Sequence, residues 1–150
     1  MTLTRRQALV AGAGAVVATA LPFGMPAFAS EEDTQKHIME FTGGKTPEAG
    51  KITLDAPEIA ENGNTVPIGV MVDSPMTADS YVESVILLAD GNPSPGVATF
   101  HFTPMSGTAA ATTRMRLAKT QNVVAVAKMN DGSVFMDKKQ IKVTIGGCGG

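Results

Sequence analysis

The fold class is decided by residues 123–136, which read VVAVAKMNDGSVFM. The apolar run at 123–127 is typical of a central strand. The four residues Asn130-Asp131-Gly132-Ser133 form a strong hairpin turn signal, because Asn, Asp and Gly tolerate the backbone angles that tight turns need. Residues 134–136 are apolar again and residues 141–145 are apolar at alternate positions, so we expect return strands after the turn.

The segments before this hairpin carry the same kind of pattern. Apolar side chains alternate with polar or small ones, or run together, at 52–54, 68–72, 81–89, 98–102 and 113–117. Turn residues separate them at 62–64, 73–75 and 90–96. About seven short strands at fairly regular spacing predict a mainly β domain over residues 44–145, an immunoglobulin-like antiparallel β-sandwich.

A short helix is expected directly before this domain. Ser30 is a good N-cap residue, and Glu31, Glu32 and Asp33 follow it where the first helical turn favours negative charge. Gly43 and Gly44 end the pattern, so the helix is predicted over residues 30–43.

The first 29 residues have the features of an export signal. Arg5-Arg6 precedes a largely apolar stretch of 14 residues (8–21), and Ala27-Phe28-Ala29 is a suitable cleavage site. Such a run rises only about 21 Å as a helix, less than the roughly 30 Å of a bilayer core, which argues against a membrane anchor. We predict a twin-arginine signal peptide over 1–29 and a periplasmic protein; the alternative is a buried N-terminal helix.

Composition excludes several classes of function. The net charge of −2 becomes more negative when Arg5 and Arg6 are removed, which argues against nucleic acid as a partner. The single cysteine rules out an internal disulfide and a metal site made of cysteines alone. Haem, dinucleotide and phosphate-loop motifs are absent, so no intrinsic cofactor is expected. The twin-arginine route then suggests assembly with a second folded subunit before export.

The last five residues are Gly146-Gly147-Cys148-Gly149-Gly150. Four glycines around one thiol predict a slender, flexible arm over 146–150, reaching up to about 17 Å. An ordinary thiol is mostly protonated at pH 7, and no basic residue follows Lys142, so a partner has to activate it. The alternative is a frayed chain end in which a cysteine happens to survive.

These features resemble the SoxY family, the sulfur-carrier subunits of the bacterial Sox thiosulfate-oxidising system. The resemblance spans almost the whole chain and is carried by the twin-arginine signal and by residues 52–54, 57–67, 73–76, 97–104 and 146–150. It implies that Cys148 holds sulfur covalently, as a cysteine S-thiosulfonate and related adducts. The swinging arm would comprise Cys148 with Gly146, Gly147, Gly149 and Gly150. The chain would then be a carrier without its own cofactor, and not an enzyme.

The resemblance also implies a set of partners. SoxZ, a small β-sandwich protein, would form a heterodimer with this chain and leave the cytoplasm with it. SoxAX, a haem enzyme, would attach thiosulfate to Cys148, and SoxB, a manganese hydrolase, would release sulfate. SoxCD, where an organism has it, would oxidise the remaining sulfur.

Other readings of the residues stay open. Cys148 could be the nucleophile of a sulfurtransferase, or could deliver a soft metal such as Cu(I) with help from Met105 or His101. It could also link two copies of the chain by a disulfide. His101 is expected at a surface or interface. Arg114 and Arg116 lie on one face of a strand, where they could dock an acidic partner, although a solvated face is the simpler interpretation.

Overall fold

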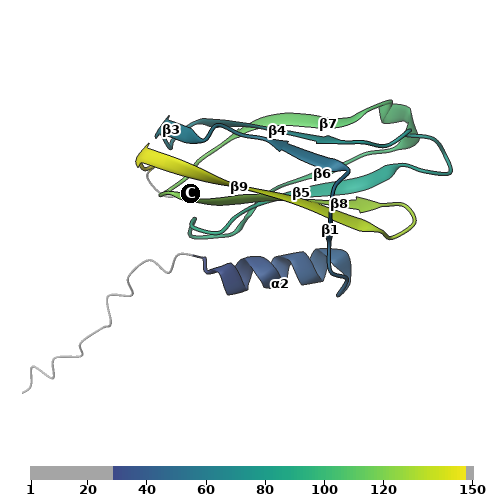
Figure 1. The fold of residues 1–150 in the computed structure, drawn as a ribbon, viewed down its shortest axis with the longest axis horizontal. Coiled ribbons are helices and arrows are strands. Elements are labelled where there is room, and N and C mark those ends of the chain that lie inside the picture. Colours follow the sequence, from purple (N-terminus) through teal and green to yellow (C-terminus); the bar gives the residue numbers. More distant parts are fainter. Residues whose placement is uncertain (1–28, 148–150) are drawn as a thin grey trace, which may run out of the picture.

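The computed structural model describes residues 29–147, in which two β-sheets lie face to face and one helix covers the outer side of the larger sheet (Figure 1). The larger sheet has the order β1-β9-β8-β5-β6, with β3 also paired to β9. Its strands are β1 (Glu48–Ala49), β3 (Ile59–Asn62), β5 (Val82–Ala89), β6 (Gly96–His101), β8 (Gln121–Met129) and β9 (Val134–Ile145). The smaller sheet has the order β2-β4-β7, with β2 (Ile52–Asp55), β4 (Val66–Val72) and β7 (Ala109–Met115).

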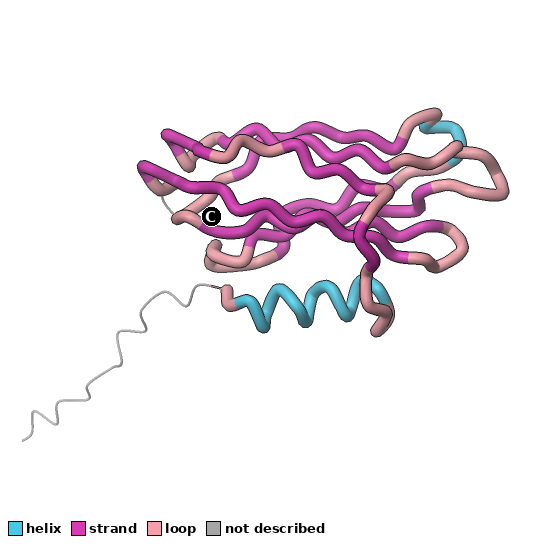
Figure 2. Tube along the Cα trace, in the orientation of Figure 1, coloured by secondary structure: helices cyan, strands magenta, loops and turns pink. Residues whose placement is uncertain are grey.

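The core lies between the two sheets, as the layers of Figure 2 indicate. In β4 every second side chain is buried, at Val66, Ile68, Val70 and Val72, which is the period-two burial that the sequence predicted. Each fully buried side chain of this kind stabilises the fold by about 1.5–3 kcal/mol relative to an exposed one. The predicted β-sandwich is therefore confirmed.

The hairpin predicted from residues 123–136 is present. Strands β8 and β9 are antiparallel, with Val126 opposite Met136 and Lys128 opposite Val134. The turn between them closes with a hydrogen bond from the Met129 N–H to the Ser133 carbonyl. The return strand is one continuous element rather than two separate pieces.

Helix α2 (Glu31–Thr42) begins and ends where the sequence predicted. The Ser30 hydroxyl oxygen accepts a hydrogen bond from the Asp33 N–H, and the Asp33 carboxylate accepts one from the Ser30 N–H. Gly43 ends the helix in the left-handed conformation, with a φ of 66°. The helix packs through Ile38 and Phe41 against a second apolar cluster on the outer face of the larger sheet, formed by Ile86, Leu88, Val124, Val126 and Met136.

Two pairings differ from the expected antiparallel pattern. Strands β1 and β3 were not predicted, and both run parallel to β9, with Glu48 opposite Phe135 and Ile59 opposite Lys142. Elements of two and four residues are too short to show an alternation, and their pairing depends on a strand far away in the sequence.

The predicted signal peptide, apart from Ala29, lies outside the described residues, as do residues 148–150. Over the described range, 29–147, no helix is both long and apolar enough to cross a membrane.

Candidate functional site

The last described residues, 145–147, lie beside two other backbone segments. After β9 ends at Ile145, the Gly147 N–H donates a hydrogen bond of 2.9 Å to the Leu117 carbonyl. The Leu117 N–H donates one of 2.8 Å to the Gly63 carbonyl, and the Gly63 N–H donates one of 2.7 Å to the Ile145 carbonyl. These bonds connect the turn after β3, the segment after β7 and the end of β9.

We call the residues in closest contact here, namely Gly63, Leu117, Ala118, Gly146 and Gly147, the arm root. Its three glycines leave no room for a side chain. A Cβ atom on Gly63 would overlap the Leu117 carbonyl oxygen, and one on Gly146 would overlap the Ala118 carbonyl oxygen. A Cβ atom on Gly147 would lie 2.8 Å from the Gly63 carbonyl oxygen, well inside van der Waals contact. None of the three has a positive φ, so their requirement is for space alone.

This packing changes one part of the sequence interpretation. The arm was expected to be free from residue 146 onward, but Gly146 and Gly147 are attached to the sandwich. Glycine permits both conformational freedom and close backbone approach, and the sequence alone does not tell these apart. The predicted arm therefore starts no earlier than Cys148, which lies with Gly149 and Gly150 outside the described residues.

A buried amide network supports the arm root from the other side. Asn92 and Gln121 are each only 4% exposed. The Asn92 Nδ2 donates to the Arg116 carbonyl at 2.8 Å, and its Oδ1 accepts from the Ala118 N–H at 3.0 Å. Gln121 Nε2 donates to the same Oδ1 at 2.9 Å, and Gln121 Oε1 accepts from the Gly91 N–H at 2.7 Å. The segment 116–118 is thus fixed between this network and the C-terminal glycines.

Sequence reasoning missed this network. Asn92 was counted only as a turn residue, and Gln121 was not singled out. The one signal that could have drawn attention to Gln121 is its place directly before the apolar run of β8. Their interaction, however, joins residues 29 positions apart and could not be read from local pattern.

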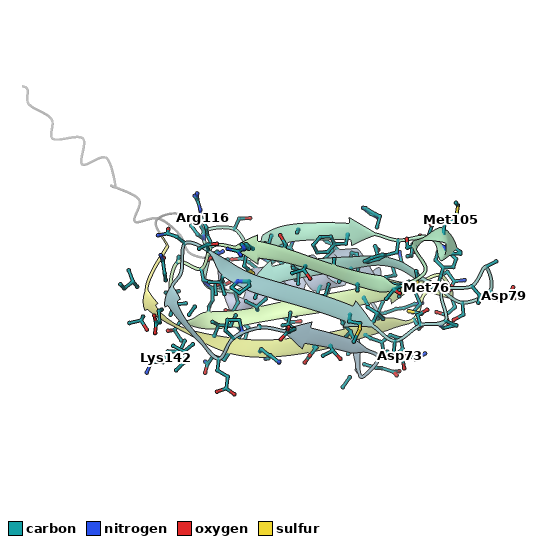
Figure 3. All side chains as sticks on the ribbon, turned by 90° about the horizontal axis from the view of Figure 1, so that it is seen from above. Asp73, Met76, Asp79, Met105, Arg116 and Lys142 are labelled. Carbon is teal, nitrogen blue, oxygen red and sulfur yellow. The ribbon has the colours of Figure 1, made fainter. Side chains whose placement is uncertain are left out.

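Basic side chains lie at the same end of the molecule. Figure 3 shows Arg116 and Lys142 near the end of the sandwich where the chain leaves it. Both are exposed, as is Arg114, and none of the three forms an ion pair with another residue of the described range. Strand β3 also carries an acidic residue, Glu61, which is exposed. Exposed cations of this kind raise the local concentration of anions.

Among the described residues, two carboxylates away from the arm root have a lowered pKa. Hydrogen bonds from the Ser30 backbone and side chain lower the pKa of Asp33 at the start of α2. Hydrogen bonds from the Ser133 side chain and backbone lower the pKa of Asp131 in the β8–β9 turn. Both carboxylates stabilise a local cap or turn, and neither belongs to the arm root.

Met105 and His101, which the sequence suggested as additional ligands for a soft metal, lie in other parts of the sandwich. Met105 lies in the short 3-10 helix η1 (Pro104–Ser106) and is 97% exposed. Figure 3 shows it at the end of the sandwich opposite Arg116, so the structure does not bring Met105 to the arm root. His101 is exposed at the end of β6, as the sequence predicted. Between residues 29 and 147, no group of three or more His, Cys, Asp or Glu side chains could hold a metal ion.

Comparisons with known proteins agree with the resemblance seen in the sequence. The family model described as "Sulfur oxidation protein SoxY" matches residues 38–148. Among solved structures, the sulfur carrier protein SoxY from Chlorobium limicola f thiosulfatophilum aligns with a TM-score of 0.63 and 33% identity, covering 77% of this chain and 100% of that chain. A comparison with curated proteins gives no match.

Proteins of a different activity share the fold. Superoxide reductase (neelaredoxin) from Ignicoccus hospitalis aligns with a TM-score of 0.56 and 18% identity, covering 77% of this chain and 94% of that chain. A putative superoxide reductase from Thermotoga maritima aligns with a TM-score of 0.53 and 20% identity, covering 69% of this chain and 89% of that chain. At such identities the likeness concerns the fold alone.

Proposed function

The chain belongs to the SoxY family of sulfur carriers, and from this premise we propose that it carries thiosulfate-derived sulfur covalently on Cys148. The carrier would work in the periplasm and present its load to separate enzymes. It would have no catalytic residues and no cofactor of its own.

One observation carries this proposal. The chain's only cysteine is residue 148, one position beyond Gly147, whose N–H is bonded to the Leu117 carbonyl, and the family match extends to this residue. Gly147 and Gly149 flank the thiol without side chains. A residue in this position can enter a narrow pocket of another protein while the sandwich stays outside.

The proposed chemistry begins with an oxidation. The sulfur of Cys148 forms a bond to the terminal sulfur of thiosulfate, while two electrons and the thiol proton pass to an oxidising partner. The product is a cysteine S-thiosulfonate. Water then breaks the bond between the two sulfur atoms derived from thiosulfate, so that one leaves as sulfate and the other stays on Cys148 as a persulfide.

This chain's own residues support the cycle through position and charge. Arg116 and Lys142 lie at the end of the sandwich where the thiol is attached, and positive charge there favours the approach of a thiosulfate anion. The glycines beside Cys148 supply no acid or base, so the partner enzymes have to activate the thiol.

The proposed partners follow from the family. SoxZ would be the permanent partner in a heterodimer, while SoxAX and SoxB, and SoxCD where present, would bind in turn. Export as a folded complex through the twin-arginine pathway would explain why a chain without a cofactor has an Arg5-Arg6 signal.

Loading of the purified protein tests the proposal. The wild-type chain and Cys148→Ser, which replaces the thiol by a hydroxyl, are incubated with thiosulfate and periplasmic extract, and intact masses are recorded. We expect one thiosulfate group to be added to the wild-type chain, to be removed by a thiol reductant, and to be absent from the variant. Equal labelling of both proteins, or of neither, would contradict the proposal.

A further inference from the structure

Gly63 occupies a central place in the arm root. Its N–H donates to the Ile145 carbonyl and its carbonyl accepts from the Leu117 N–H, while the Leu117 carbonyl accepts from the Gly147 N–H. The residue therefore joins the end of β9 to the segment on which Gly147 rests.

The space around Gly63 admits no other residue. A Cβ atom at this position would overlap the Leu117 carbonyl oxygen, and would lie 2.8 Å from the Gly147 nitrogen and 2.9 Å from a methyl carbon of Val143. Gly69, in the middle of β4, is a useful contrast. A Cβ atom there would lie 3.4 Å from the Asp55 Cβ, which is an ordinary contact.

We propose that Gly63 is a positioning residue for Cys148: it holds Gly147 on Leu117 and so fixes the point from which the cysteine leaves the sandwich. The inference rests on the proposed carrier function and adds to it a residue far from the thiol in sequence. When a partner enzyme docks on the sandwich, the sulfur group on Cys148 then lies at a defined distance from the docking surface.

Covalent geometry gives the size of the effect. With Gly147 attached, the Cα atom of the next residue lies about 3.8 Å from that of Gly147. With Gly146 and Gly147 released, three Cα–Cα steps separate that atom from the Ile145 Cα, and its reach grows to about 11 Å. The accessible volume rises by roughly 20-fold, and the effective concentration of the thiol at any one point falls in proportion.

Hydrogen exchange tests the attachment in the unloaded protein. We expect the Gly147 amide to be protected in the wild type and in the control Gly69→Ala. In Gly63→Ala it should exchange at least about tenfold faster, because its bond to Leu117 is lost. An unprotected Gly147 in the wild type, or equal protection in Gly63→Ala, would overturn the inference.

Enzyme kinetics test the consequence for presentation. The measured step is release of sulfate from thiosulfate-loaded carrier by periplasmic extract, with the loaded carrier as the varied substrate. We expect Gly63→Ala to lower kcat by about tenfold and to leave KM nearly unchanged, because docking uses the intact sandwich while placement of the load is lost. An unchanged kcat in a variant whose Gly147 amide is released would refute the positioning role.

A second variant covers the case in which Gly63→Ala does not fold. In Gly146→Ala, the added Cβ atom would overlap the Ala118 carbonyl oxygen to a comparable extent. Residue 146 lies near the end of the chain, so it can move away without opening the core. As in Gly63→Ala, the Gly147 amide should exchange faster and kcat should fall. If they do not, the attachment does not position the load.

Failure of the carrier proposal would look different, because wild-type Cys148 would then take up no sulfur. In that case a nitroxide attached to Cys148 reports its position without any partner. The label should broaden the amide signals of Leu117 and Ala118 in the wild type more than in Gly63→Ala. Equal broadening in the two proteins would overturn the positioning role.

Discussion

Asn92 offers the most informative test of how the arm root is supported. The substitution Asn92→Ala removes a buried amide that donates to the Arg116 carbonyl and accepts from the Ala118 N–H, while leaving both backbone groups in place. Gln121 also loses one partner, but its Nε2 retains a bond of 3.1 Å to the Lys119 carbonyl.

The magnitude follows from the groups left without partners. The Arg116 carbonyl and the Ala118 N–H, whose hydrogen bonds to Asn92 are part-buried, lose these partners. Each loss is expected to cost about 1.5 kcal/mol, toward the low end of the range for an unsatisfied buried group. We therefore expect Asn92→Ala to lower the free energy of unfolding by about 3 kcal/mol. With a urea m value of about 1.5 kcal/mol per molar, this corresponds to a midpoint about 2 M lower.

Urea unfolding of the chain without its predicted signal measures this difference. The matched control is Asn64→Ala at the same end of the sandwich, because Asn64 is exposed and its side chain makes no hydrogen bond within the described range. The control should stay within about 0.5 kcal/mol of the wild type. A similarly small effect of Asn92→Ala would refute the view that this amide network supports the arm root.

Three further predictions concern the core, the hairpin turn and the charged end. Leu54→Ala should lower the free energy of unfolding by about 2–5 kcal/mol in urea titrations, because Leu54 is fully buried between the sheets, and a loss below 1 kcal/mol would contradict the described core. Ser133→Ala should raise the pKa of Asp131, followed by NMR titration, toward its ordinary value of 3.8. In the wild type the stabilisation from this lowered pKa is present above that value and is lost as the pH falls through the lowered pKa, so the variant should show a weaker loss on acidification; an unchanged titration would refute the hydrogen-bond assignment. Arg116→Glu should slow the loading of Cys148 with thiosulfate several-fold at low salt, with a smaller difference at high salt, and equal loading rates at low salt would exclude a role for this charge.

Local features of the fold could be predicted from the sequence. The caps of α2 depend on Ser30, Asp33 and Gly43, which are neighbours in the chain, and the alternation in β4 appears directly as apolar residues at every second position. The Asn130 to Ser133 turn is equally local. These signals were sufficient to predict a sandwich with one helix.

Contacts between distant segments could not be predicted in the same way. The pairing of β3 with β9 and the bond between Asn92 and Gln121 each join residues that carry no local sign of one another. Glycine was the most misleading residue type, because Gly146 and Gly147 suggested freedom where the structure uses them for close packing. The assignment of Cys148 as the carrier thiol stays a prediction from the sequence. The hydrogen bonds that join Gly63, Leu117 and Gly147 have no local sign in the sequence.

The central claim is that Cys148 carries sulfur in the cell. Its most direct test is the intact mass of the protein purified from the periplasm of cells grown on thiosulfate, compared with Cys148→Ser and measured before and after a thiol reductant. The account predicts added sulfur or thiosulfonate groups on the wild-type protein that the reductant removes and that the variant lacks. Only free thiol in the wild-type protein under these conditions would contradict it.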